Sequence, residues 1–483
     1  MKTHKIITLI CLSLWLYACN DWLDVKPESK IDERKIFSSE EGFKEALLGV
    51  YDKMASADLY GKRMTMEFVD ILGQRYKTSE SAYAYRHAGA YDYASADVTP
   101  QIEAIWQKAY NAIADCNNLL EQMTGRENLF TGDNYELIRG ELYGIRAYLH
   151  FDLLRLFGPV YKENRTQKCL RYYDRFTQAI LPDFLTAEAF AVKVLDDLKV
   201  AGELLANDRV KTENPRSKGS GDSFLGYRFN RMNFYAVEAL KARVLLYTGD
   251  FADAKIAAAK VIAASKELRG TEALFPWVTQ SEADNKQDPD RIFHKEIIFG
   301  LYVSSLPVWQ DGLFEGTDRT MVLLPYKNRL EELFPNATDY RSNWFGYAPS
   351  QDDKIVCKYA EPVNRNRYVF EKVVPMIRLS EMYLIAAECT ADASEAILNY
   401  INPIEENRRM LPYSGNEDLG DLLTTEYARE FFGEGQLFYF YKRRNVSSVK
   451  DGSSMSSITM TPEKYVIPLP VSEMKYSEGS ELK

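Results

Sequence analysis

Residues 232–265 read MNFYAVEALKARVLLYTGDFADAKIAAAKVIAAS, and they decide the fold class of this chain. On both sides of a Gly249-Asp250 turn, apolar residues recur three and four positions apart. That period is typical of amphipathic helices, and a turn containing glycine returns the second helix along the first. The stretch therefore predicts an antiparallel helix pair over 231–247 and 250–266.

The small residues of this pair have a spacing close to that of a tetratricopeptide unit. Ala242, Ala254 and Ala258 allow the two helices to approach closely, and Phe251 fills the joint between them. Residues 375–409 hold a looser version, again with alanines at the expected contacts. Because repeated helical units pack on their neighbours, two of them in one chain favour a helical-repeat scaffold.

Helical periodicity covers most of the remaining sequence. A Ser38-Ser39 N-cap followed by two acids opens a helix near residue 40. Residues 297–303, IIFGLYV, are the best strand candidate. The predicted fold class is mainly α: a tetratricopeptide-like helical-repeat scaffold with an irregular, loop-rich lobe and a few short strands. Other helices are expected at about 100–123, 135–157, 187–206, 375–391, 393–409 and 424–441.

The first 18 residues, MKTHKIITLICLSLWLYA, have the pattern of a signal peptide, with lysines before an apolar run too short to span a bilayer. Cys19 follows at the expected cleavage point and resembles the acylated cysteine of a bacterial lipobox. An ordinary signal peptide with an incidental cysteine is the alternative. We expect a lipid on Cys19 that holds the mature chain to a membrane, and a polar tether over residues 19–37.

Residues 38–483 are expected to form a single body. Long irregular stretches in a folded protein are usually functional. We therefore assign residues 70–99 and 267–374 to an irregular lobe that faces the ligand. The helical scaffold is expected from about 38–69, 100–157, 187–266 and 375–445.

The composition is that of a folded, mildly acidic protein. Of the 483 residues 46% are hydrophobic, and the formal net charge of −10 argues against nucleic-acid binding. The four histidines include no i, i+4 pair, and no phosphate loop, nucleophile elbow, HExxH motif or dinucleotide fingerprint occurs. We therefore expect no enzyme, no cofactor and no metal centre. A glycosidase-type pair of carboxylates is the open alternative, because 70 acids make chance pairs plentiful.

Four cysteines remain besides Cys19 and the one in the signal peptide. They form no CxxC or zinc-type cluster. Outside the cytoplasm they can pair in any of three ways, and the favoured interpretation is four buried thiols. These residues are Cys116, Cys169, Cys357 and Cys389.

Two aromatic features of the predicted lobe suggest a binding surface. Residues 83–93 read YAYRHAGAYDY and place four tyrosines within eleven residues. Flat aromatic faces stack on sugar rings while nearby polar side chains bond the hydroxyls. The alternative is that the rings cap the helical core beneath the loop. The residues predicted to bind a ligand are Tyr83, Tyr85, Tyr91, Asp92, Tyr93 and, after the strand candidate, Trp309.

Four blocks of sequence resemble, in the same order, those of the SusD/RagB family of surface nutrient-binding lipoproteins. They are CNDWLDVKPES…FSSEEGFKEALLGVYDKM, ELYGIRAYLHFDLLRLFGPV, PMIRLSEMYLIAAE and YVIPLPVSEM. The block TTEYAREFFGEGQLFYFYKRR keeps Glu430, Glu434 and Gly435 but lacks the His-Arg-Trp run that usually follows in the family. We expect this helix to be structural, so the departure leaves the predicted fold unchanged.

The resemblance implies a helical fold with four tetratricopeptide-like units, at the outer membrane and facing the cell exterior. It also implies a lid-like partnership with a TonB-dependent, SusC-like transporter barrel. Asp21 and Asp24, just after Cys19, are similar to surface-export signals. The implied function is non-catalytic binding of oligosaccharides and their delivery to the transporter. The alternatives are a peptide-binding member of the same uptake system, a secreted glycoside hydrolase and a purely scaffolding helical repeat.

Overall fold

The computed structural model describes residues 33–177, 180–218, 223–347, 353–361 and 372–476. The expected signal peptide, Cys19 and residues 19–32 of the expected tether lie outside the described residues.

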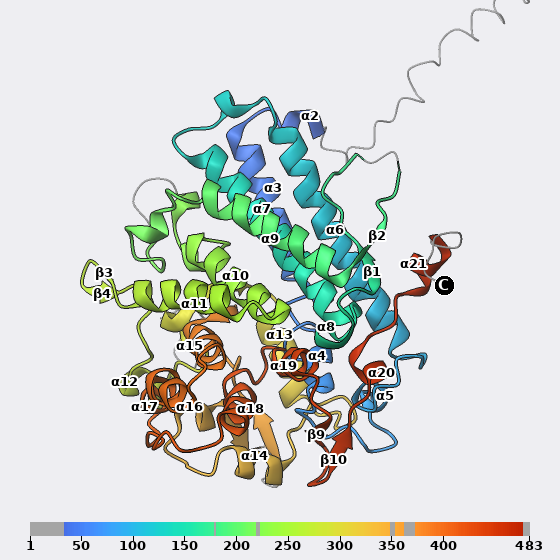
Figure 1. Cartoon of the computed structure of the whole chain (residues 1–483), viewed down its shortest axis with the longest axis vertical. Coiled ribbons are helices and arrows are strands. Elements are labelled where there is room, and N and C mark those ends of the chain that lie inside the picture. Colours follow the sequence, from blue (N-terminus) through green and yellow to red (C-terminus); the bar gives the residue numbers. More distant parts are fainter. Residues whose placement is uncertain (1–32, 178–179, 219–222, 348–352, 362–371, 477–483) are drawn as a thin grey trace, which may run out of the picture.

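Long helices that lie side by side form most of the body (Figure 1). They are α3 (Glu40–Met54), α6 (Thr99–Met123), α7 (Asn134–Phe157), α9 (Ala187–Leu204), α10 (Phe234–Thr248), α11 (Phe251–Ser265), α15 (Leu379–Glu388), α18 (Leu419–Glu430) and α19 (Leu437–Arg444). In space α7 contacts both α6 and α9, α9 contacts α10, and α11 contacts both α10 and α15. This succession is that of a helical-repeat array, in which each pair covers the next.

Shorter helices and π-helical segments connect the long helices and build the lobe. They are α2 (Glu33–Ile36), α4 (Phe68–Leu72), α5 (Arg86–Gly89), α8 (Tyr161–Asn164), α12 (Gln280–Ala283), α13 (Leu306–Gln310), a π-helical segment (Asp311–Glu315), α14 (Lys327–Leu333), α16 (Ala393–Ala396), a second π-helical segment (Ile397–Ile401), α17 (Asn402–Asn407), α20 (Pro462–Tyr465) and α21 (Val471–Tyr476).

The strands of the described residues form five separate two-stranded antiparallel sheets, β1–β2, β3–β4, β5–β8, β6–β7 and β9–β10. The β5–β8 pair joins segments far apart in the chain, with Ile297 opposite Arg378 and Tyr302 opposite Val373. The bounds are β1 (Lys168–Arg171), β2 (Phe184–Thr186), β3 (Leu268–Arg269), β4 (Glu272–Ala273), β5 (Ile297–Tyr302), β6 (Phe345–Tyr347), β7 (Lys354–Val356), β8 (Val373–Arg378), β9 (Ser448–Lys450) and β10 (Ser457–Thr459).

The local sequence explains where the long helices begin and end. The Ser39 hydroxyl accepts a hydrogen bond from the Gly42 N–H at 3.3 Å, which confirms the predicted N-cap of α3. Asp250 caps α11, and Gly249 ends α10 with a left-handed φ of 86°. The helix pair predicted from residues 232–265 is therefore confirmed.

The predicted fold class and the predicted strand β5 are confirmed, but two predicted helices are wrong in part. Residues 373–378, expected to start a helix near 375, form β8, and all six are buried. A strand buried on both faces shows no alternation that distinguishes it from a helix. The helix expected over 424–441 is interrupted between α18 and α19, where Gly433 and Gly435 have φ of 77° and 69°.

A buried network of ion pairs holds the second half of the chain together. Arg408 contacts Glu296 at 2.7 Å and Glu430 at 2.8 Å between side-chain nitrogen and oxygen atoms. Arg378 contacts Glu430 at 2.8 Å and Glu434 at 2.9 Å. Because a buried charge without a partner is very unfavourable, these pairs fix β8, α17 and α18 around the base of β5. Glu430 and Glu434, which the block TTEYAREFFGEGQLFYFYKRR keeps, are therefore structural, as expected.

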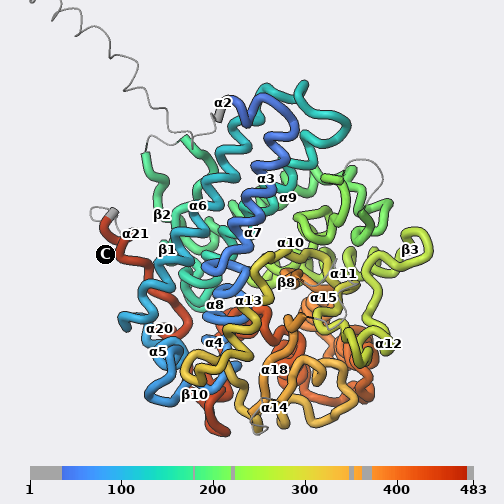
Figure 2. Tube along the Cα trace, turned by 180° about the vertical axis from the view of Figure 1, so that it is seen from behind, coloured from blue at the N-terminus to red at the C-terminus, as the bar shows by residue number. Residues whose placement is uncertain are grey.

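One hydrophobic core runs from Phe37 to Ile467 through all parts of the described chain. The four described cysteines are free thiols; Cys116 and Cys169 are buried, and Cys357 and Cys389 are half-buried. The C-terminal segment, red in Figure 2, runs back along the helical scaffold, so α21 lies beside α6 and β1.

Candidate ligand-binding site

The tyrosine loop packs onto the body and does not stand open. The side chains of Tyr91 and Tyr93 are only 7% and 8% exposed. The Tyr91 hydroxyl donates to the Leu72 carbonyl at 2.8 Å, and the Tyr93 hydroxyl donates to the Lys464 carbonyl at 2.6 Å. These two rings therefore fasten the loop to α4 and α20. They do not form the open aromatic platform expected from the sequence.

Tyr85 is also buried, with 7% of its surface exposed. Its hydroxyl donates to Oε1 of Glu67 at 3.3 Å, and its ring meets that of Tyr83 edge-on at a centroid distance of 5.9 Å. Of the six predicted residues, Tyr83 and Trp309 are half-buried and Asp92 is exposed. Ligand contact by any of the six stays a prediction, and these three have accessible surface.

Trp309 lies on α13, directly after β5 in the chain. A Cβ atom added at Gly61 would lie 2.3 Å from Cζ3 of the Trp309 ring, so the ring packs directly against the backbone of the segment 55–67. In both overall views α13 lies beside α4, which follows this segment (Figures 1 and 2). The close approach requires glycine at position 61, and it fixes the ring against the backbone of a segment that also carries charged side chains.

The segment 55–67 gathers charged side chains around Glu67, which is 4% exposed. Lys62 Nζ lies 2.9 Å from Oε1 of Glu67, and Arg63 Nε lies 3.8 Å from Oε2. Arg63 also forms an ion pair with Asp58. The Lys62 and Arg63 side chains keep 23% and 22% of their surface exposed, so they border the solvent.

Several buried polar atoms of this region have no hydrogen-bond partner within the described part of the chain. They include Oγ of Ser56, Nε of Arg63 and Oε2 of Glu67. Buried polar groups are nearly always hydrogen-bonded, so such a group needs an explanation. Donors and acceptors on the segment that packs against a half-open indole ring are suited to a hydroxyl-rich ligand. We refer to Lys62, Arg63, Glu67, Tyr83 and Trp309 as the lobe site.

Sequence reasoning missed the charged members of the lobe site. Residues 55–67, ASADLYGKRMTME, were grouped with the helical scaffold although they carry a glycine and break the helical period. In the structure most of this segment is turns between α3 and α4. The sequence feature that could have identified these residues is an irregular, charged stretch between two predicted helices.

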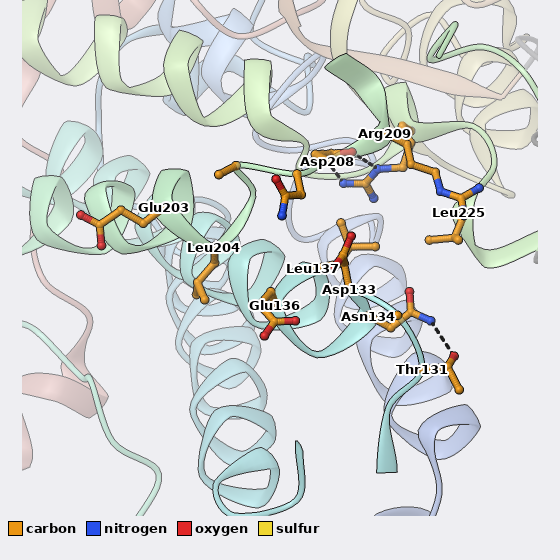
Figure 3. A pocket seen from close by; sticks show the side chains of 14 residues that line it. Thr131, Asp133, Asn134, Glu136, Leu137, Glu203, Leu204, Asp208, Arg209 and Leu225 are labelled. Atoms are coloured by element: carbon orange, nitrogen blue, oxygen red, sulfur yellow. Dashed lines mark hydrogen bonds and ion pairs between the residues drawn. The ribbon is translucent and has the colours of Figure 1, made fainter. Parts of the chain in front are cut away.

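A separate hollow of about 590 Å³ lies at the start of α7, next to the end of α9 (Figure 3). Its lining includes the acids Asp133, Glu136 and Glu203 and the ion pair of Asp208 with Arg228, whose nearest atoms are 2.7 Å apart. No aromatic side chain lines it. Without a flat apolar face, this hollow is not suited to stacking a sugar ring.

Two further properties bear on function. Within the described ranges, no group of three or more His, Cys, Asp or Glu side chains is arranged to hold a metal ion. Among the helices of the same residues, none combines the length and the apolar character needed to cross a membrane.

Two family models match the sequence. The SusD-like model described as "Starch-binding associating with outer membrane" matches residues 21–220, and the SusD family model matches residues 321–475. SusD-like protein P38 of Formosa agariphila is 25% identical over 92% of this chain and 92% of its own length. SusD-like protein P25 of the same organism is 23% identical over 46% of this chain, which corresponds to 41% of its own length.

Solved structures share the fold. A SusD superfamily protein from Bacteroides thetaiotaomicron has a TM-score of 0.70 at 21% identity, covering 90% of this chain and 98% of that one. A SusD-like carbohydrate binding protein from Bacteroides vulgatus has a TM-score of 0.69 at 19% identity, covering 91% and 97%. Surface glycan-binding protein A from Bacteroides thetaiotaomicron has a TM-score of 0.65 at 15% identity, covering 92% and 99%.

The architecture and these matches first define a class: helical-repeat proteins that carry an irregular lobe. Within that class, the chain belongs to the SusD/RagB family, as the sequence blocks predicted. At the level of the family, the description of the first model gives the function as carbohydrate binding in association with the outer membrane.

Proposed function

We propose that this protein captures oligosaccharides at the lobe site without altering them. The observation that carries the proposal is the half-open Trp309 ring, held against Gly61 of the segment 55–67, in which buried polar atoms lack a hydrogen-bond partner among the described residues. An indole face binds the apolar face of a sugar ring, and the neighbouring ammonium, guanidinium and carboxylate groups bond its hydroxyls. Membership of a carbohydrate-binding family supports the same ligand class.

We further propose that a lipid on Cys19 holds the protein to the outer membrane, facing the cell exterior, and that a TonB-dependent transporter barrel receives the captured glycan. The signal-like N-terminus and the SusD-type sequence blocks support this part. Purification of the full-length protein from its native membrane tests it directly. A co-purifying barrel and an acylated N-terminal peptide in mass spectrometry are the expected results, and an unmodified cysteine contradicts the anchor.

The binding proposal is tested with residues 20–483 on a glycan array, followed by calorimetry with the oligosaccharide that binds best. Replacing Trp309→Ala removes the stacking face, so we expect affinity to fall about tenfold or more, since about 1.4 kcal/mol corresponds to a factor of ten. The matched control is Val308→Ala. Val308 is the neighbouring residue on α13 and is 71% exposed, so its loss leaves the ring in place.

Equal melting temperatures of the two variants show that the body is intact. Unchanged affinity in Trp309→Ala contradicts the lobe site. Competition by peptides but not by sugars identifies a peptide-binding member of the family instead. Turnover of a polysaccharide by the purified protein contradicts non-catalytic capture.

A further inference from the structure

A groove of about 670 Å³ lies on the helical scaffold, away from the lobe site. It runs between α6, the segment that follows β1, and α21. These three elements lie side by side at one edge of the molecule in both overall views (Figures 1 and 2). None of the lobe-site residues lines this groove.

Four aromatic side chains line the groove: Trp106, Tyr110, Tyr173 and Phe176. The Trp106 and Tyr110 centroids are 4.7 Å apart, and those of Tyr110 and Tyr173 are 5.3 Å apart. Tyr110 and Tyr173 are half-buried and form the accessible wall, whereas Trp106 is 6% exposed and supports it. Phe176 is 51% exposed at the same groove. Such an extended apolar surface in a hollow is unlike the acidic hollow beside α7, which has no ring.

The wall is held in place from behind. The Trp106 ring meets Phe157 edge-on at a centroid distance of 4.9 Å. The Tyr110 hydroxyl donates to the Arg171 carbonyl at 3.2 Å. The Asn117 amide donates to the Tyr173 carbonyl at 2.9 Å, which positions the backbone that carries the third ring. A ligand therefore meets rings whose positions are already fixed, which lowers the entropy lost on binding.

Polar side chains border the rings. Asn111 and Arg175 line the groove, and both are exposed. An amide both donates and accepts, as vicinal sugar hydroxyls do, and a guanidinium supplies further donors. Flat apolar faces bordered by amide and cationic groups match a pyranose ring, which has C–H faces and hydroxyl edges.

We infer that this groove is a second carbohydrate-binding site, formed by the scaffold and independent of the lobe site. Its ligand class rests on the proposed function of the protein, but its position does not. Two sites on one molecule hold a long glycan more firmly than either site does alone, because engagement of the second site becomes intramolecular.

The test uses residues 20–483 on a glycan array and by calorimetry, with four forms of the protein. The first two forms are the wild type and Trp309→Ala. The groove variant combines Trp309→Ala with Asn111→Ala and Phe176→Ala. The fourth form combines Trp309→Ala with Asn118→Ala and Phe251→Ala. The last form is the matched control. Asn118 lies on α6 outside the groove lining, and Phe251 is a 49% exposed phenylalanine of α11.

We expect Trp309→Ala to retain glycan binding. The groove variant is expected to bind glycan at least tenfold more weakly than Trp309→Ala, and the control is expected to bind as tightly as Trp309→Ala. All replaced groove residues are exposed, and equal melting temperatures show that folding is unaffected. Equal binding by the groove variant and the control overturns the second site, as does complete loss of binding in Trp309→Ala alone. A wild type that binds no glycan overturns the proposed function itself, which is a different result from either.

Discussion

Lys442 is a buried lysine whose ammonium donates to two main-chain carbonyls, those of Leu156 at 2.9 Å and Gly158 at 2.8 Å. Burial lowers its pKa to about 7. The pKa of an unfolded lysine is about 10.4. Between these values the unfolded chain binds more protons than the folded chain, so the free energy of unfolding rises with pH. Below about pH 7 both states carry the proton, and the unfavourable burial of the charge is fully present.

Replacing Lys442→Met removes this titration. We expect the wild type to gain stability relative to the variant on going from about pH 7 to pH 9, by on the order of 1–2 kcal/mol. Urea unfolding of both proteins across this range measures the difference. If the free energies of unfolding of the two proteins change in parallel with pH, the titration does not belong to Lys442. This comparison does not depend on the stability of the variant at neutral pH.

At the scale of single residues, the sequence predicted some members of the candidate site and not others. Trp309 was predicted from its position in a loop after a strand, and it keeps an accessible face. Tyr91 and Tyr93 were predicted by the same reasoning, but the acceptor for Tyr93 is the carbonyl of Lys464, 371 positions further along the chain. Local composition does not indicate such a distant partner.

At the scale of elements, periodic sequence was enough to place the long helices. The helices expected at 100–123 and 135–157 are α6 and α7, each within a residue of the predicted bounds. The interruption between α18 and α19 was not predicted because it depends on a distant side chain. The Asp70 carboxylate accepts hydrogen bonds from the N–H groups of Gly433 at 2.6 Å and Gly435 at 3.0 Å.

Replacing two glycines of the scaffold helices by alanine is expected to change the free energy of unfolding in opposite directions. Gly249 has a φ of 86°, so Gly249→Ala forces a side chain into the left-handed region and lowers the free energy of unfolding by about 1 kcal/mol. Gly49 lies within α3, is exposed and has open space around it, so Gly49→Ala raises the free energy of unfolding by about 0.5–1 kcal/mol. Urea unfolding of both variants measures these changes. Changes of the same sign in both contradict the backbone argument.

At the scale of the whole molecule, the two segments that match the family models contribute to one hydrophobic core. The family models match residues 21–220 and 321–475 separately, whereas the hydrophobic core is continuous from Phe37 to Ile467. Glu296 lies before residue 320, and both of its buried partners, Arg378 and Arg408, lie after it. The division into a single body from residue 38 onward stays a prediction that a fragment can test.

A chain of residues 20–320 lacks β8, and its Glu296 has neither arginine partner. We expect this fragment to show no cooperative thermal unfolding by circular dichroism, because an unpaired buried charge and an unpaired buried strand remain. Co-expression with residues 321–483 is the control and restores a folded complex. A soluble fragment with a sharp thermal transition contradicts the single body.

The pairing of β5 with β8 has a consequence for how proteins of this architecture diversify. Both strands are anchored at their bases by the network around Glu296 and Arg378, and the 303–372 insert leaves and re-enters between them. Trp309 belongs to this insert, and so does Arg341, whose buried guanidinium pairs with Glu426 at 2.7 Å and Glu430 at 3.0 Å in the body. A replacement insert must therefore supply its own cation to the buried Glu426 and Glu430, so segments between these two strands can be exchanged within this architecture only together with that ion pair.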